Sequence, residues 1–217
     1  MQNIAVAERT KNLLCQDTGI PIYNLVIGRN VEFDGPAMKA AIRLGCERAT
    51  KEHPLRSSVV HPVTRKNEQT SCGVGIPIIH VDFDEREETV AIEMIPKGSG
   101  SENGSFLQML VPAGGVAAVK RFVIDKVIEC GGRVCPPTIV GVGIGGTSDL
   151  CMHLAKIAAT RPLGTTCADA EGAKNAAQLS ERVNSLSLGR QSRRVRASSF
   201  RLHDAVAAHP ITLTPIA

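Results

Sequence analysis

The chain has 217 residues, which is enough for one domain with a substantial core. Its 43% hydrophobic and 21% charged residues are ordinary for a globular protein, and no apolar run is long enough to span a membrane. The N-terminus lacks the pattern of a secretion signal, so we expect a cytoplasmic protein. In that compartment its seven cysteines are expected to be thiols, metal ligands or catalytic groups.

The positive charge of the chain is local. The net charge of +4 depends on one short stretch without acidic residues, which contains Arg190, Arg193, Arg194, Arg196 and Arg201. Without these five arginines, 20 basic residues face 21 acidic ones. This distribution does not predict a nucleic-acid partner.

The first half of the chain alternates strand and helix patterns. In order, these predict a helical segment up to residue 14, a strand at 20–28, a helix at 34–51 capped by Asp34, and strands at 76–83 and 89–95. The long loop at 53–75, between the expected helix at 34–51 and the expected strand at 76–83, is a candidate for function. The segment 97–104 is too rich in Gly and Ser for regular structure to be expected.

The pattern in the second half of the chain predicts crossover helices. Helices are expected at 116–130, 149–160 and 174–186, with a buried strand at 138–144 and a further strand from residue 211. Residues 187–208 are rich in Arg and Ser without a period, which is typical of a solvated or disordered segment. We therefore expect an α/β (mixed α+β) fold, a single domain with a central mixed sheet and flanking helices over 1–186, followed by a divergent segment at 187–217.

Residues 15–19, Cys-Gln-Asp-Thr-Gly, form the first candidate site. The thiolate of Cys15 beside the carboxylate of Asp17 suits a metal ligand next to a group that transfers a proton. On the pattern alone, a half-buried cysteine and an aspartate that caps a turn is the more frequent arrangement.

Two later motifs surround the buried strand at 138–144. Proline directly after Cys135 is common in loops that bind metal clusters, although a packing cysteine in a turn also fits. Gly141, Gly143 and Gly146 match a dinucleotide-binding fingerprint, but the second strand with its terminal acid is missing. The amides at the start of the following helix could instead hold a carboxylate.

Isolated residues complete the candidates. Arg56 in the long loop could clamp a carboxylate, and the segment 97–103 could be an anion-binding nest or a linker. His209 alone resembles an ordinary surface histidine. Cys46, Cys130 and Cys151 lie at helical positions typical of packing cysteines. Nothing around Cys72 or Cys167 indicates a ligand.

Together the motifs resemble one family, the alpha subunits of two-subunit class I fumarate hydratases and L(+)-tartrate dehydratases. The matching pieces are CQDTGIPIY, PLR, IPKGSGSEN, CPPTIVGVGIGGTSDL and AATRPLG, in the family's order from residue 13 to 164. The resemblance implies that residues 1–186 are an iron–sulfur hydro-lyase catalytic domain. It also implies a beta subunit as partner and a small dicarboxylate as substrate, with neither nucleic acid nor membrane.

The resemblance also assigns site residues. It implies a 4Fe–4S cluster held by Cys15 and Cys135, whose third cysteine ligand would fall just beyond residue 217 and is absent from this chain. Gln16 and Arg56 match substrate-binding positions, as do Gly98 and Gly100 in a loop that closes on the substrate. Asp17, as a proton donor, and His209 match the family's catalytic positions.

Four interpretations follow from the sequence. Reversible hydration of fumarate to malate is favoured, because KGSGSEN resembles the fumarate-type loop more closely than the tartrate-type loop. The alternatives are the alpha subunit of a tartrate dehydratase, an inactive truncated family member, and a nucleotide-binding protein that uses the glycine motif. We expect Cys15 and Cys135 to lie close together, with Asp17 and Arg56 beside the same substrate.

Overall fold

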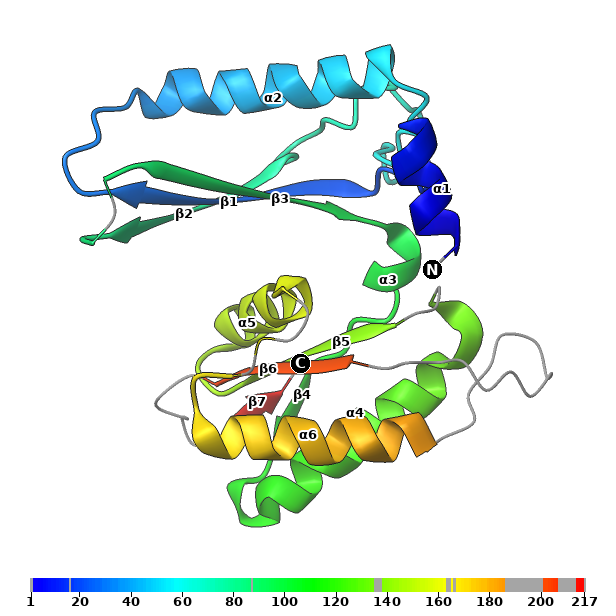
Figure 1. The fold of residues 1–217 in the computed structure, drawn as a ribbon, viewed down its shortest axis with the longest axis vertical. Helices are drawn as coiled ribbons and strands as arrows, with labels where there is room; N and C mark the ends of the chain where they lie inside the picture. The colour runs from blue at the N-terminus through cyan, green and yellow to red at the C-terminus, as the bar shows by residue number, and fades with distance from the viewer. Residues whose placement is uncertain are drawn as a thin grey trace. The chain divides into compact units, whose positions relative to one another are not determined.

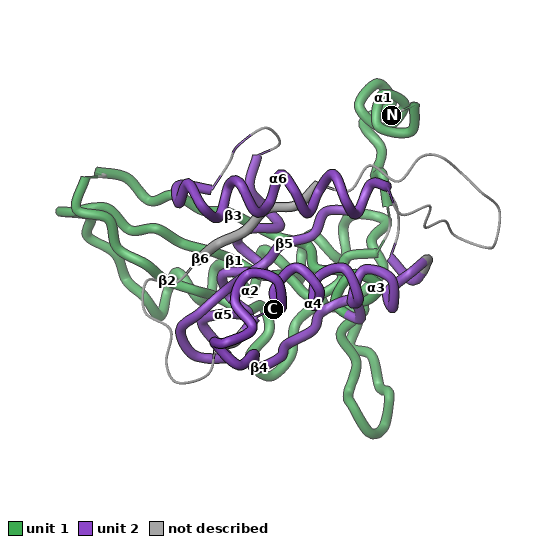
Figure 2. The backbone as a smooth tube through the Cα atoms, turned by 90° about the horizontal axis from the view of Figure 1, so that it is seen from below, with its two compact units in different colours: residues 1–102 green, residues 103–217 purple. Residues whose placement is uncertain are grey.

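The protein forms two compact units, Met1–Glu102 and Asn103–Ala217, which Figure 2 colours separately. The computed structural model describes residues 2–15, 17–86, 88–134, 138–162, 165, 167–185, 201–206 and 214–216. The α/β class is confirmed, but the described strands form two sheets instead of one central sheet. Among the described strands, β2 and β3 pair only with β1, while β4 to β7 pair among themselves.

Unit 1 is a three-stranded sheet with one long helix. After α1 (Gln2–Thr10), β1 (Ile20–Gly28) forms the centre of the sheet. It pairs in parallel with β2 (Ile78–Asp84) and antiparallel with β3 (Val90–Lys97). The helix α2 (Gly35–Glu52) lies over one face of this sheet (Figure 1). The predictions for β1 and α2 are confirmed almost to the residue.

The start of α2 and its contact with the sheet follow from local chemistry. The carboxylate of Asp34 caps the helix by accepting the amide hydrogen of Ala37 at 3.0 Å. On the inner side, the hydroxyl of Tyr23 lies 3.2 Å from Sγ of Cys46. Burial beside this thiol raises the pKa of Tyr23. Because alternate strand residues share a face, Tyr23, Leu25 and Ile27 all lie on the face beneath α2.

Unit 2 is a four-stranded sheet in the order β4-β7-β5-β6, formed by Gln108–Leu110, Thr214–Ile216, Ile139–Ile144 and Arg201–Val206. The helix α5 (Ser148–Thr160) covers one face, while α4 (Gly115–Cys130) and α6 (Ala170–Ser185) lie on the other (Figure 1). Short 3-10 turns flank α4 at Pro112–Gly114 and Gly131–Arg133. Aliphatic residues dominate the core, which contains Phe122, Val123, Val127, Val142, Leu179, Val183 and Ile216.

Two predictions of irregular structure are wrong. Within 97–104, Ser99–Glu102 form a single helical turn, α3, because the hydroxyl of Ser101 and the amide of Glu102 both donate to the carbonyl of Gly98. Within 187–208, Arg201–Val206 form the strand β6, parallel to β5. An edge strand is held by backbone hydrogen bonds to one neighbour, so it does not need an apolar period. The rest of 187–208 lies outside the described residues.

Candidate functional site

The polar cluster around Asp17 is the candidate active site, and all of its described members belong to unit 1. Ser58 donates its hydroxyl to Oδ1 of Asp17 at 2.7 Å, and Nη2 of Arg56 lies 3.2 Å from the same oxygen. The hydrogen bond from Ser58, helped by Arg56 and the amide of Gly19, holds the pKa of Asp17 below its ordinary value despite partial burial. Asp17 is therefore ionised at neutral pH.

Backbone contacts bring these distant segments together. Asp17 and Arg56 form an isolated parallel bridge, and the amide of Thr18 donates to the carbonyl of Arg56 at 3.4 Å. The expected proximity of Asp17 and Arg56 is thus observed. Neither residue is fully enclosed, because the Asp17 side chain is 22% exposed and the Arg56 side chain 69% exposed. The pair can be reached by a small molecule.

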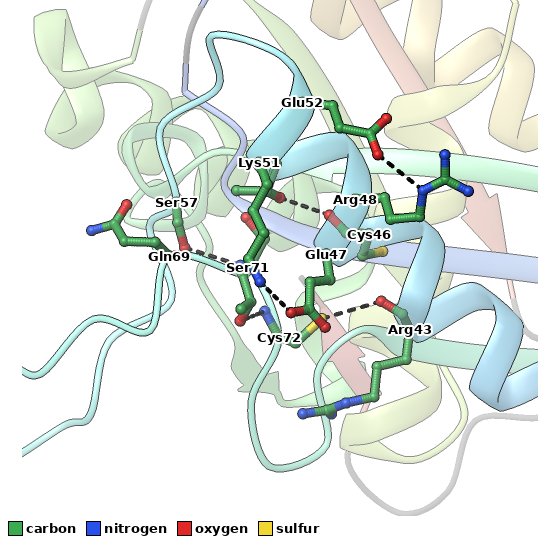
Figure 3. A network of polar contacts seen from close by, with 12 residues as sticks. Arg43, Cys46, Glu47, Arg48, Lys51, Glu52, Ser57, Gln69, Ser71 and Cys72 are labelled. Atoms are coloured by element: carbon green, nitrogen blue, oxygen red, sulfur yellow. Dashed lines mark hydrogen bonds and ion pairs between the residues drawn. The ribbon is translucent and has the colours of Figure 1, made fainter.

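The long loop that carries Arg56 and Ser58 is anchored by Ser57. This buried side chain accepts the amide hydrogen of Ser71 at 3.1 Å, and its carbonyl accepts from Nδ2 of Asn67 at 2.9 Å. Figure 3 shows Ser57 and Ser71 joined in this way, with the sulfur of Cys72 directed at the backbone carbonyl of Arg43 in α2. The loop is therefore held to α2 on one side while it presents Arg56 and Ser58 to Asp17.

The segment 97–102 approaches Asp17 from a third direction. A Cβ atom at Gly98 would lie 3.1 Å from Oδ2 of Asp17, so the backbone of Gly98 directly faces the second carboxylate oxygen. The turn is braced by Lys97, whose Nζ reaches Oγ of Ser101 at 2.8 Å and the carboxylate of Glu102 at 3.4 Å. Gly98 therefore leaves room beside the carboxylate.

Gly19 makes this approach possible. Its φ of +60° is a left-handed conformation, and a Cβ atom there would lie 2.0 Å from the carbonyl oxygen of Lys97. Only glycine tolerates both the angle and the contact. The turn that follows Asp17 can therefore lie directly against the start of the 97–102 segment.

Cys15 is suited to hold metal. Of the six cysteines that the structure describes, it alone is exposed, and its Sγ accepts the amide hydrogen of Asp17 at 3.5 Å. Such hydrogen bonds to sulfur stabilise a cluster-binding thiolate. By contrast, Cys46 lies beside Tyr23, and the thiols of Cys72 and Cys151 donate to backbone carbonyls. These three buried thiols have the packing environment expected of structural cysteines.

Comparison with known proteins identifies the family. A family model described as Fumarate hydratase (Fumerase) matches residues 1–211. The chain belongs to the fumarate hydratase family. It is 44% identical over 192 residues to the "Putative L(+)-tartrate dehydratase subunit alpha" of Methanocaldococcus jannaschii, covering 87% of this chain and 67% of that protein. It is 28% identical over 200 residues to the "L(+)-tartrate dehydratase subunit alpha" of Escherichia coli strain K12, covering 92% of this chain and 66% of that protein.

This member of the fumarate hydratase family spans about two thirds of the length of these relatives. The family resemblance inferred from its motifs is confirmed. Gln16, Cys135 and His209 lie outside the described residues, so the expected proximity of Cys15 and Cys135 stays a prediction. Gly100 lies in α3, while the described residues contain no group of three or more His, Cys, Asp or Glu that could hold a metal ion. No described helix is long and apolar enough to cross a membrane.

In this family member, the glycine motif of unit 2 serves packing. A Cβ atom at Gly141 would lie 2.0 Å from the carbonyl oxygen of Ala155, and one at Gly143 would lie 2.1 Å from that of Cys151. Both glycines therefore let α5 lie directly against β5. The amides at the start of α5 already serve Asp149, whose pKa is lowered by hydrogen bonds from Thr147 and from the backbone at Leu150. This arrangement argues against both a nucleotide and a substrate carboxylate at that helix end.

Ser58 is the residue that sequence reasoning missed. It follows the PLR motif, but the contact with Asp17 joins positions 41 residues apart, so no local pattern reveals it. The only available signal was the polar character of the loop after Arg56. Gly19 was likewise treated as part of a motif, although its positive φ and its contact with Lys97 explain why it is needed.

Proposed function

We propose that the chain is the alpha subunit of an iron–sulfur hydro-lyase that reversibly hydrates fumarate to malate. The observation that carries this proposal is the ionised Asp17, held by Ser58 and Arg56 two residues after the exposed thiol of Cys15. A proton-transfer group, a cation for a carboxylate and a metal ligand are the three elements that the reaction needs. The membership of the chain in the fumarate hydratase family supports the same conclusion.

Asp17 transfers a proton to or from a carbon atom of the substrate. Because its pKa is lowered, it rests as a carboxylate and accepts a proton from the carbon next to the hydroxyl-bearing carbon when malate is dehydrated. In the hydration direction the same carboxyl group must first take up a proton before it can donate one. To act as a proton donor, Asp17 must therefore be protonated, whereas its surroundings favour the ionised form.

Arg56 binds the substrate carboxylate that lies away from the metal. Only its Nη2 contacts Asp17 among the described residues, and most of the side chain is exposed. The remaining donors of the guanidinium can therefore form the paired hydrogen bonds that a carboxylate accepts. Gly98 and Gly100, in the adjoining segment, leave the backbone accessible to the same small molecule, while Gln16 and His209 are proposed to complete the site.

Cys15 and Cys135 would hold the cluster. A cluster iron with an open position supplies a Lewis acid that polarises the substrate hydroxyl or water. The environment of Cys15 fits this use, because its side chain is exposed and its sulfur accepts the amide hydrogen of Asp17. Asp17 follows Cys15 by two residues, so its carboxylate would be available for proton transfer near the metal ligand.

Dehydration of L(+)-tartrate is a second candidate. Both relatives described above carry names of tartrate dehydratase alpha subunits, and a 2-hydroxy-dicarboxylate can use the same aspartate and arginine. The hydroxy acids of the two reactions, malate and L(+)-tartrate, differ in one hydroxyl group. Malate formation from fumarate and oxaloacetate formation from L(+)-tartrate, assayed side by side, distinguish them. The remaining alternative is a family member without activity.

The decisive experiment starts with anaerobic reconstitution of the chain with iron and sulfide, alone and together with a beta-type subunit. We expect bound iron and malate formation in the assembled protein and no turnover by the chain alone. Cys15→Ser should lose iron, whereas the matched variant Cys130→Ser should retain it. Full iron retention by Cys15→Ser, or robust turnover without a partner, would contradict the proposed ligands or the proposed division between subunits.

A further inference from the structure

The two side chains that contact Asp17 reach the same oxygen but differ in strength. The hydroxyl of Ser58 lies 2.7 Å from Oδ1, a length typical of a strong bond to an ionised acceptor. Nη2 of Arg56 lies 3.2 Å from Oδ1, beyond the usual length for a charged N–H donor, on a side chain that is 69% exposed. Ser58 is therefore the tighter anchor of the two.

Neighbouring serines in this loop have separate tasks. Ser57 is buried and bonds to the loop itself through Ser71 and Asn67. Ser58 makes no such contact with the loop among the described residues, and its hydroxyl is directed at Asp17. Ser57 thus fixes the backbone from which Ser58 reaches the carboxylate. A serine that only stabilised the loop would not need this direction.

From this geometry we infer that Ser58 is a positioning residue, which holds Oδ1 of Asp17 so that Oδ2 faces Gly98 and the substrate. This inference rests on the proposed function for the use of Oδ2. Arg56 makes the longer of the two contacts and is also the residue proposed to bind a substrate carboxylate. When the guanidinium binds that carboxylate, the shorter bond from Ser58 keeps the aspartate in place.

The position of Gly98 supports this division between the two oxygens. Both side-chain donors that the described residues supply reach Oδ1, whereas Oδ2 lies where a Cβ atom of residue 98 would come within 3.1 Å. The two oxygens of an ionised carboxylate are equivalent, so a half-turn restores the same arrangement, whereas a smaller rotation or a change of side-chain rotamer breaks the bond to Ser58. Ser58 therefore fixes the orientation of the carboxylate, with one oxygen bonded and the other facing Gly98.

The test combines kinetics with a measurement that does not need activity. In the assembled enzyme, Ser58→Ala should lower kcat for fumarate hydration by about 10- to 100-fold with little change in KM, because substrate binding is left to Arg56. Ser58→Thr should restore most of the rate. In the chain without cluster or substrate, three-bond couplings to the carboxyl carbon of Asp17 should report one side-chain rotamer in the wild type and averaging in Ser58→Ala.

The controls separate positioning from other roles. Ser185→Ala removes another serine hydrogen bond, from Oγ to the carbonyl of Arg182 in α6, and should change neither kinetics nor the rotamer of Asp17. Should Ser58→Ala fail to fold, Ser58→Cys, a weaker donor of similar size, should show an intermediate loss. A single rotamer in Ser58→Ala, or a rise in KM without loss of kcat, would overturn the inference. Absence of hydration by the assembled wild type would refute the proposed function instead, while the couplings still decide the positioning role.

Discussion

Two glycine-rich segments of the chain, 97–104 and 141–146, look alike in sequence but face different neighbours. At Gly143, in unit 2, a Cβ atom would meet the backbone of α5 at 2.1 Å. At Gly98, in unit 1, it would meet the carboxyl group of Asp17, with Oδ2 at 3.1 Å and Cγ at 3.9 Å. The missing side chain allows a helix to pack on a strand in one segment and leaves room beside a carboxylate in the other. The use of a glycine motif is thus decided by what faces it.

Two aspartates extend this comparison. Both Asp17 and Asp149 have a lowered pKa, but Asp149 obtains its donors from Thr147 and from its own helix. The side-chain donors of Asp17 come from Ser58 and Arg56, about forty residues later in the chain. A charge satisfied locally stabilises the first turn of a helix, whereas a charge held by converging segments can serve a ligand. A lowered pKa alone does not distinguish these two cases.

The largest expected effect is on folding. Gly143→Ala should lower the free energy of unfolding by about 3 kcal/mol, because its Cβ atom would collide with backbone that cannot move without separating α5 from β5. The matched control is Gly45→Ala in α2, where nothing lies within 4 Å, and it should raise stability by about 1 kcal/mol. Urea unfolding of the three proteins measures both values. Equal stability of Gly143→Ala and the wild type would show that this glycine is not needed for packing.

At Gly98 the same substitution should spare the fold and impair the site. The neighbour there is the end of a side chain, which can give by a few tenths of an ångström, so stability should change by less than about 1 kcal/mol. The displaced carboxylate of Asp17 should lower kcat for fumarate hydration roughly tenfold. Steady-state malate formation by the assembled enzyme measures this loss. Unchanged turnover would remove Gly98 from the proposed site.

A smaller effect, in the pH dependence of stability, should distinguish Asp149 in the first turn of α5 from the candidate active site. Because the folded-state pKa of Asp149 lies below the unfolded value, its stabilising contribution is complete above the unfolded pKa. The contribution is lost as the pH falls through the lower, folded-state value. Asp149→Asn should therefore flatten the fall in urea midpoint over this acidic range and leave fumarate turnover at neutral pH unchanged. A loss of turnover would connect unit 2's helix end to the reaction.

The elements were more predictable than the contacts between them. Apolar periodicity predicted β1 and α2 almost to the residue, because both are long and have a clear period. It did not predict β6, because Arg201–Val206 are held by backbone pairing at a sheet edge. At the site, family motifs pointed to Asp17 and Arg56, whereas Ser58 depends on a loop whose path is determined by Ser57 and Ser71. Such a path is a tertiary property that no local pattern encodes.

The smallest expected change in stability concerns Arg56, and it separates binding from folding most sharply. Because its side chain is 69% exposed and its contact with Asp17 is long, Arg56→Lys should change the free energy of unfolding by less than about 0.5 kcal/mol. Lysine keeps the charge but cannot form the paired bonds of a guanidinium, so KM for fumarate should rise roughly tenfold. Arg48 is the matched control, since it is 65% exposed and pairs with Glu52 at 3.0 Å on α2. Arg48→Lys should leave KM unchanged. If Arg56→Lys also leaves KM unchanged while it destabilises the chain, Arg56 braces the loop and another residue binds the substrate carboxylate.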